Sequence, residues 1–212
     1  MRFTGWPERA FEFYEGMEAD NSKAYWTAHR AVYDADILAP TEALLEELAE
    51  EFGDGRIFRP YRDVRFSPDK SPYKTAMAAT LSRGGYVRLS ADGLAVGSGY
   101  HMMSPDQLAR YRVAVAEDIS GEQLLRVIGQ VEADGLAILG EDRLKTAPRG
   151  YPKDHPRIDL LRNKGLIAWR EWPVEPWMHT ARAKGRIVEN FRAALPLREW
   201  LDDHVGPAEQ RG

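Results

Sequence analysis

Cysteine is missing from this chain of 212 residues, and so is any long apolar run. Without cysteine the protein has no disulfides, no thiolate metal ligands and no cysteine nucleophile. No apolar stretch approaches the roughly 20 residues that a transmembrane helix needs, so we expect no membrane partner. The first residues show no apolar segment followed by small residues, so we expect no secretory signal. These absences predict a cytoplasmic protein.

The spacing of the histidines and the net charge argue against a metal site and a nucleic-acid partner. The five histidines never lie three or four residues apart, so a helical zinc pair is absent and we predict no metal site. The net charge is −4, which repels phosphate backbones. Nucleic acid is therefore not an expected partner, unless a local basic face outweighs the overall charge.

The composition is that of a folded domain. Hydrophobic residues make up 43% of the chain and charged residues 29%, close to the averages for globular domains. We find no internal repeat, no low-complexity tract and no linker-like stretch that would mark a boundary. A chain of this length can bury roughly 70% of its unfolded surface around one core. We therefore predict a single domain over residues 1–212.

Helical patterns dominate the first third of the chain. Pro7 can open a helix that carries Phe11, Tyr14 and Met17, and residues 20–22 supply capping oxygens for a second helix. The apolar stripe continues beyond Pro40, which interrupts or kinks it, and Gly53 ends it. Later in the chain, Ser104-Pro105 starts a helix, and a final helical pattern begins near Pro176 and is ended or kinked by Pro196.

Strand patterns occupy the middle of the chain. Larger apolar residues at 87, 89, 94 and 96 alternate with small or polar residues on either side of Ala91-Asp92-Gly93, which is typical of a tight antiparallel hairpin. Residues 61–66 and 77–81 are predicted as neighbouring strands, and residues 166–172 as another. The expected fold class is α+β, with an antiparallel β-sheet packed against several helices.

Residues 62–75 form the one stretch of strong chemical character. Arg62, Arg65, Lys70 and Lys74 are interleaved there with acidic, proline and aromatic residues. Proline restricts the backbone, so these charges are expected in a fixed loop. Guanidinium forks and ammonium groups bind carboxylates and phosphates, and a helix that starts near Pro72 would add its own positive end. The segment therefore predicts an anion-binding site.

Two aspartates and two serines of the same segment allow further roles. Asp63 and Asp69 could orient the arginines, or act as general bases if a pocket raised their pKa. Ser67 and Ser71 each begin a Ser-Pro-x-Lys pattern, which in some enzymes pairs a serine nucleophile with a lysine. A serine before proline is also a common helix N-cap, and we favour that interpretation.

Two other interpretations of the segment stay open. Its charges could pair with one another and pin the loop to the sheet edge, with Phe66 and Tyr73 in the core. The segment could also dock a protein together with exposed Trp and Tyr residues, which often dominate binding interfaces. In that case the chain would be an interaction module without catalytic activity.

The string R-D-x-R-F-S-x-D-K-S-P-Y-K-T at residues 62–75 resembles a family of conserved hypothetical proteins that is classified as a domain of unknown function. The likeness includes residues 13–16, 21–23 and 144–151, so it covers almost the whole chain. It implies membership but no activity, substrate or cofactor. The shared block at 144–151 also contains Arg149 in a rigid turn, and Arg149 joins the basic cluster if this turn folds against the first segment.

The sequence thus predicts a protein that binds, and could act on, a phosphorylated or carboxylated small molecule. The candidate ligands of that anion are Arg62, Arg65, Lys70, Lys74 and Arg149. Whether the chain is an enzyme, which cofactor it uses and how it oligomerises are left open by the residues alone.

Overall fold

The computed structural model describes residues 2–65 and 67–209. The chain divides into two compact units. The first unit comprises Met1–Val96 and Glu171–Glu189, and the second comprises Gly97–Arg170 and Asn190–Gly212. The prediction of one domain over residues 1–212 stays a prediction.

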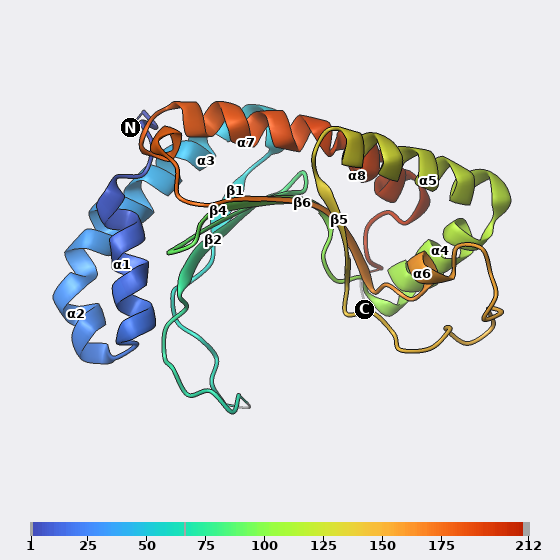
Figure 1. The fold of residues 1–212 in the computed structure, drawn as a ribbon, viewed down its shortest axis with the longest axis horizontal. Coiled ribbons are helices and arrows are strands. Elements are labelled where there is room, and N and C mark those ends of the chain that lie inside the picture. The colour runs from blue at the N-terminus through green and yellow to red at the C-terminus, as the bar shows by residue number, and fades with distance from the viewer. Residues whose placement is uncertain (1, 66, 210–212) are drawn as a thin grey trace. The chain divides into compact units, whose positions relative to one another are not determined.

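The first unit begins with helices in the order that the apolar spacing predicts (Figure 1). These are α1 (Glu8–Ala19), α2 (Lys23–Val32), the π-helix η1 (Tyr33–Leu38) and α3 (Ala39–Phe52). Pro7 precedes α1, and the Ser22 side chain caps α2 by accepting a hydrogen bond from the N–H of Tyr25 (3.1 Å). Gly53 ends α3 with a φ of 78°, which glycine adopts without steric cost.

The interruption predicted at Pro40 is a wide turn in a continuing helix. Pro40 has no N–H to donate and lies in the first turn of α3. The turns just before it widen into η1, where the N–H of Ala39 donates to the carbonyl of Asp34. The π-turn accommodates the hydrogen bond that Pro40 cannot donate. The apolar stripe of α2 therefore continues into α3 without a break.

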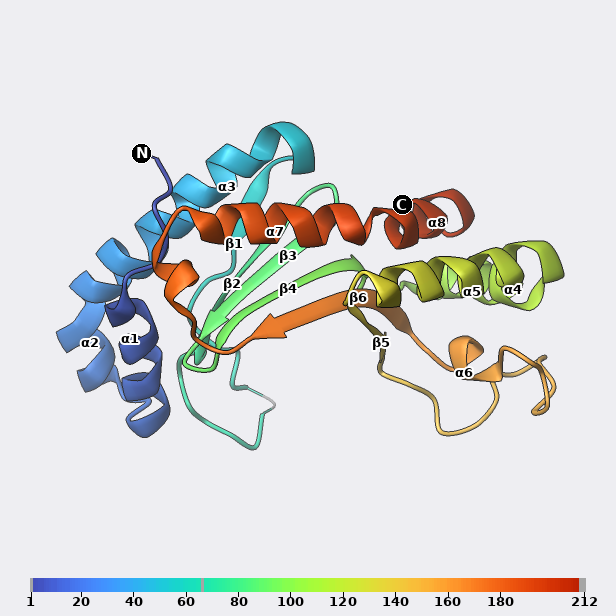
Figure 2. The same ribbon diagram turned by 45° about the horizontal axis from the view of Figure 1, so that its top comes forward.

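The remaining elements of the first unit are strands and two short C-terminal pieces. They are β1 (Gly55–Ile57), β2 (Ala76–Leu81), β3 (Gly85–Ser90), the start of β4 (Gly93–Tyr100), the end of β6 (Gly165–Trp172), the 3-10 helix η2 (Pro176–His179) and most of α7 (Arg182–Ala193). Helices α3 and α7 lie over one face of β1, β2 and β3 (Figure 2), and Lys184 of α7 pairs with Glu47 of α3 (2.6 Å).

Strand alternation decides which side chains face these helices. Met77, Ala79 and Leu81 of β2 are buried, as are Val87 and Leu89 of β3. The intervening residues, which include Ala78 and Arg88, are only partly buried and lie on the opposite face. This second face carries the pocket described below.

The second unit packs helices around its own core. It contains α4 (Pro105–Ala116), α5 (Asp118–Ala133), β5 (Ala137–Glu141), α6 (Ile158–Leu161) and α8 (Leu195–His204). Ser104 and Gln107 form a capping box at the start of α4, as Ser104-Pro105 predicts. Tyr111, Leu124 and Trp200 are fully buried in this core. Pro196 lies in the first turn of α8, where α7 has ended.

Among the described residues the strands form a six-stranded sheet in the order β1-β2-β3-β4-β6-β5. The sheet is antiparallel, with β2 paired to β3 in the register Ala78↔Arg88. The predicted α+β class and the predicted hairpin at residues 91–93 are confirmed.

One predicted strand is wrong. Residues 61–65 form no strand beyond a single bridge between Tyr61 and Tyr73, and Phe66 lies outside the described residues. The edge strand is instead β1, a three-residue segment. No helix in the described part of the chain is long and apolar enough to cross a membrane.

Candidate functional site

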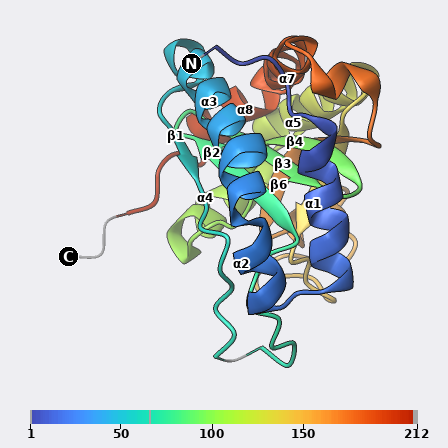
Figure 3. The ribbon, with the colours of Figure 1, turned by 90° about the vertical axis from the view of Figure 1, so that its left-hand side faces the viewer.

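The described residues of the segment from Arg62 to Thr75 lie in a long loop between β1 and β2 that extends away from the sheet (Figure 1, Figure 3). Its two arms run side by side near the sheet. The N–H of Arg62 donates to the carbonyl of Pro72 (2.9 Å), and the N–H of Lys74 donates to the carbonyl of Pro60 (2.8 Å). These two backbone hydrogen bonds join the arms at the base of the loop.

The base of the loop is fixed by contacts with α2 and the residue before its cap. Asn21 donates to the carbonyl of Tyr73 (3.1 Å) and accepts from the N–H of Tyr73 (3.0 Å). The Tyr73 ring is buried and stacks on Trp26 with centroids 4.7 Å apart. Tyr61 lies against both rings. The fixed loop that the prolines predict is therefore anchored mainly by Asn21 and aromatic stacking.

Ion pairs occupy both arginines of the loop. Arg65 binds both carboxylate oxygens of Asp63, with its Nη2 2.6 Å from Oδ2, and Arg62 pairs with Asp69. Lys70 donates to the carbonyl of Val64 (2.9 Å). Arg65, Asp63 and Lys70 are exposed. For these residues the geometry matches the interpretation in which the loop's charges pair internally.

The two aspartates are weak bases in this setting. The Arg65 guanidinium holds the pKa of Asp63 below its usual value. Hydrogen bonds from the Ser71 hydroxyl, then from Arg62, hold the pKa of Asp69 far below its usual value. A carboxylate with a lowered pKa accepts a proton poorly at neutral pH. The contacts of Asp63 and Asp69 therefore suit orientation of the arginines better than general-base chemistry.

The predicted helix near Pro72 is absent, and that expectation was wrong. Residues 67–75 contain no helix, so neither Ser67 nor Ser71 is an N-cap. The Ser71 hydroxyl donates to Asp69 (2.6 Å) instead. Serine and aspartate two residues apart form a local hydrogen-bonded turn, which competes with helix formation.

A pocket of about 650 Å³ lies where the loop returns to the sheet. Ala76 and Ala78 of β2 form part of its wall, and Arg88 of β3 is the neighbour of Ala78 in the register. Because alanine side chains are small, they leave space beneath the loop. Arg62, Lys74 and Arg88 line this space, and we call it the basic pocket. Glu18 and Asp69 also line it.

Lys74 differs from the other cations of the basic pocket. It is partly buried, and its ammonium lies 5.3 Å from the centre of the Phe58 ring. Among the described residues no carboxylate forms an ion pair with it. Burial, followed by the nearby charge of Arg59, lowers its pKa below 10.5. The basic pocket thus holds a partly buried cation that no described carboxylate pairs with.

Arg88 belongs to the pocket although no motif in the sequence points to it. Its side chain pairs with Glu171 of β6 (3.2 Å). Its position between Val87 and Leu89 shows by alternation that it faces away from the core. That signal could have placed Arg88 on the second face, but only the β2–β3 register brings it beside Ala78 in the wall of the pocket.

The remaining predicted residue, Arg149, lies in the second compact unit. It occupies a turn in which the N–H of Tyr151 donates to the carbonyl of Pro148 (3.2 Å), and Gly150 has a φ of 90°. Arg149 is exposed. Its participation in the basic cluster stays a prediction. No group of three or more His, Asp or Glu side chains able to hold a metal occurs within residues 2–65 and 67–209.

Two solved structures are similar to this chain. One is an uncharacterized protein from Methanothermobacter thermautotrophicus, with 14% identity, a TM-score of 0.42, and coverage of 78% of this chain and 99% of that one. The other is a conserved hypothetical protein from Pyrococcus furiosus, with 16% identity, a TM-score of 0.36, and coverage of 80% and 98%.

No curated protein sequence matches the chain. A family model matches residues 9–200, which confirms the predicted family membership. The chain belongs to the family of conserved hypothetical proteins DUF2461.

Proposed function

We propose that this protein binds a phosphorylated or carboxylated small molecule in the basic pocket of Arg62, Lys74 and Arg88. The observation that carries the proposal is Lys74, a partly buried ammonium whose pKa is lowered and which no described carboxylate neutralises. Burying a charge without a partner costs free energy. A bound anion would offset that cost, so the pocket favours an anion thermodynamically.

The two arginines support an anion at the same place. Arg62 is held by Asp69 and Arg88 by Glu171, so each guanidinium is already oriented before a ligand arrives. Pre-oriented donors lose less conformational entropy on binding. Planar guanidinium groups also suit the oxygens of carboxylate and phosphate.

The size and polarity of the pocket indicate a small, polar ligand. Its volume of about 650 Å³ lies within the usual range for small-molecule sites. Glu18 and Asp69 bring negative charge to the lining and would repel a uniformly anionic molecule. A single anionic group attached to a body with hydroxyl or amine donors fits this arrangement, as in a sugar phosphate or an amino acid.

A pair of matched lysine variants tests the proposal. Lys74 lines the basic pocket, whereas Lys70 is exposed and hydrogen bonded to Val64. Melting temperatures would be measured with inorganic phosphate, sugar phosphates, nucleotides, amino acids and dicarboxylates, since a ligand of the native state raises the melting temperature. Affinity for any stabilising compound would then be compared by calorimetry in the wild type, Lys74→Met and Lys70→Met.

We expect Lys74→Met to weaken binding about tenfold or more, because it removes a partly desolvated charge contact worth more than about 1.4 kcal/mol. Lys70→Met should bind like the wild type. Arg88→Met and Arg65→Met form a second pair with the same expected difference. Equal losses for Lys74→Met and Lys70→Met, or no stabilisation by any anion at millimolar concentration, would contradict the proposal.

The alternative function, a protein-interaction module, is favoured by a different surface of the first unit. That surface lies along the edge strand β1 and does not include Lys74 or Arg88.

A further inference from the structure

The free edge of the sheet carries backbone groups without partners. Hydrogen bonds join Phe58 N–H to Ala78 and Ser82 N–H to Asp54 (both 2.9 Å). In an antiparallel ladder, hydrogen-bonded residues alternate with residues whose N–H and C=O point to the other side. Gly55 and Ile57 are those alternate residues. Within the described part of the chain, no hydrogen bond engages their N–H or C=O groups.

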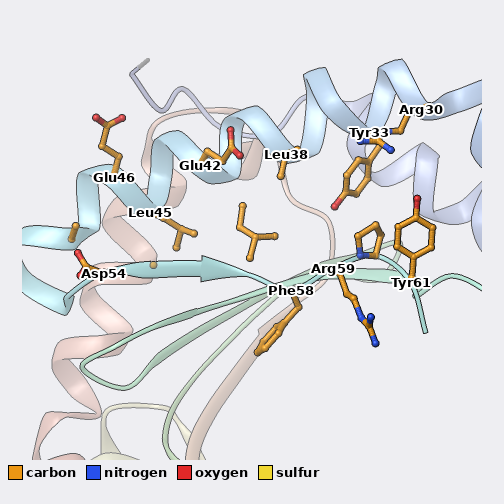
Figure 4. Close-up of a pocket in the computed structure, with 14 residues that line it drawn as sticks. Arg30, Tyr33, Leu38, Glu42, Leu45, Glu46, Asp54, Phe58, Arg59 and Tyr61 are labelled. Carbon is orange, nitrogen blue, oxygen red and sulfur yellow. The ribbon is translucent and has the colours of Figure 1, made fainter. Parts of the chain in front are cut away.

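These groups lie beside a groove of about 590 Å³ between β1 and the helices η1 and α3 (Figure 4). Leu38 and Leu45 line its helical side, with Glu42 between them, and Ile57 lines its strand side. We call this surface the edge groove. Free strand edges beside a helix are a general way to capture an extended peptide, since the strand supplies hydrogen bonds and the groove receives alternate side chains.

Gly55 shows how closely α3 approaches the strand. A Cβ at Gly55 would lie 2.7 Å from the Cβ of Leu45, so only glycine fits there. At Ile57, two positions further on, the groove is open enough that the side chain is only partly buried. A guest side chain opposite Ile57 would contact Ile57 and Leu45, which gives the groove a site for one aliphatic residue.

Charge is separated along the edge groove. Asp54 and Glu46 line the end where β1 begins, and Arg59 and Arg30, which also pairs with Asp34, line the end where β1 passes into the loop. Figure 4 shows the acidic pair at one end and Arg30, beside Tyr33, at the other. Opposite charges at the two ends select both the charge pattern and the direction of a bound peptide.

We propose that the edge groove binds an extended peptide as an additional antiparallel strand, with an acidic residue opposite Arg59, an aliphatic residue opposite Ile57 and a basic residue opposite Gly55, near Asp54. These three peptide positions alternate with two others, so their side chains point to the same face. The antiparallel direction sets the order from acidic to basic. This inference does not depend on the basic pocket.

A designed pair of peptides tests the charge pattern. The probe is the fluorescent, blocked pentapeptide Glu-Thr-Val-Thr-Lys, and its matched control is Lys-Thr-Val-Thr-Glu, which has the same composition. Fluorescence anisotropy would measure both affinities at low salt. The first peptide should bind about tenfold more tightly than the second, because two attractive charge pairs replace two repulsive ones. The difference should shrink at high salt.

A pair of protein variants tests strand addition itself. Ile57→Pro removes an N–H that points to the free edge and leaves the ladder to β2 intact, whereas Ile57→Ala keeps the N–H and removes most of the side chain. We expect Ile57→Pro to reduce affinity at least tenfold, and more than Ile57→Ala does. Circular dichroism and melting would confirm that both variants are folded, and bound peptide should slow amide exchange at Gly55 and Ile57 in the wild type.

Three results would overturn the proposal. The first is equal affinity for the two peptides, and the second is unchanged binding by folded Ile57→Pro. The third is slow amide exchange at Gly55 and Ile57 without peptide that becomes fast on dilution, because it would show that a second copy of the chain covers the edge. If Ile57→Pro fails to fold, exchange at these two amides in the wild type decides the question.

Discussion

Asn21 holds the backbone of Tyr73 with both ends of its side-chain amide, donating to the carbonyl and accepting from the N–H. The two residues are 52 positions apart in the chain. This contact ties the residue before the α2 cap to the returning arm of the loop, and the Tyr73 ring stacks on Trp26 directly beside it. Asn21 also lines the basic pocket, so the same contact shapes the candidate site.

Replacement of Asn21 should destabilise the protein and weaken anion binding together. Asn21→Ala leaves the N–H and C=O of buried Tyr73 without partners, at a cost of about 2 kcal/mol in the free energy of unfolding. Asn21→Asp keeps the acceptor for the N–H and should cost less. Urea unfolding measures both values. A larger loss for Asn21→Asp than for Asn21→Ala would show that the paired hydrogen bonds are not the source of the effect.

Anion binding to the basic pocket should take up protons in alkaline solution. The pKa of Lys74 is lowered below 10.5, chiefly by burial, and a nearby anion stabilises the charged ammonium and raises that pKa again. Between the lowered pKa and 10.5, the free amine is partly neutral and binds a proton when the anion enters. Affinity should therefore fall as the pH rises through this window.

Calorimetry in two buffers of different ionisation enthalpy would count these protons. Lys74→Met should show no uptake at the same pH, whereas Lys70→Met should behave like the wild type. In the ligand-free protein the unfolded chain binds the Lys74 proton more tightly than the folded chain does. The contribution of Lys74 to stability should therefore rise as the pH rises through the same window. Proton release on binding would contradict the assignment.

Amide exchange should alternate along β1. Ile57 N–H points to the free edge, whereas Phe58 N–H is bonded to the carbonyl of Ala78. We expect the Ile57 and Gly55 amides to exchange much faster than the Phe58 amide in the ligand-free protein. Hydrogen exchange followed by NMR gives the rates residue by residue. Equal protection of Ile57 and Phe58 would mean that the edge is already covered.

Among the arginines of the second unit, replacement of Arg157 should lower the free energy of unfolding the most. Its guanidinium is buried and donates to the carbonyls of Val115 and Ala116 at 2.7 and 3.0 Å, and it also pairs with Glu122 (2.9 Å). Arg157→Met leaves the two carbonyls without donors and should lower the free energy of unfolding by about 3 kcal/mol.

Arg143 provides the matched control for Arg157. It pairs with Asp159 at the surface, where such pairs contribute little, so Arg143→Met should cost less than about 1 kcal/mol. Thermal or urea unfolding of both variants gives the comparison. Similar costs for Arg143→Met and Arg157→Met would show that burial of the Arg157 guanidinium is not what matters.

Local patterns in the sequence were enough for much of the fold. Apolar spacing, caps and the turn at Ala91-Asp92-Gly93 depend on residues a few positions apart, and α1, α2 and the β3–β4 hairpin agree with them. The same patterns missed β1, because three residues that include a glycine show no periodicity. They also predicted a helix starting near Pro72, where the local hydrogen bond between Ser71 and Asp69 competes with helix formation.

By itself the sequence determined the helices, the hairpin and the location of the charged segment, because neighbouring residues decide these features. Tertiary structure alone decided which of these charges are free to bind a ligand. Asp63 and Asp69 lie close enough to Arg65 and Arg62 to pair with them, whereas Lys74 is brought beside Arg59 and partly buried without a described acidic partner. Arg88 reaches the same pocket only through the register of β2 and β3. Burial and strand register are properties of distant residues in contact, and no local pattern encodes them.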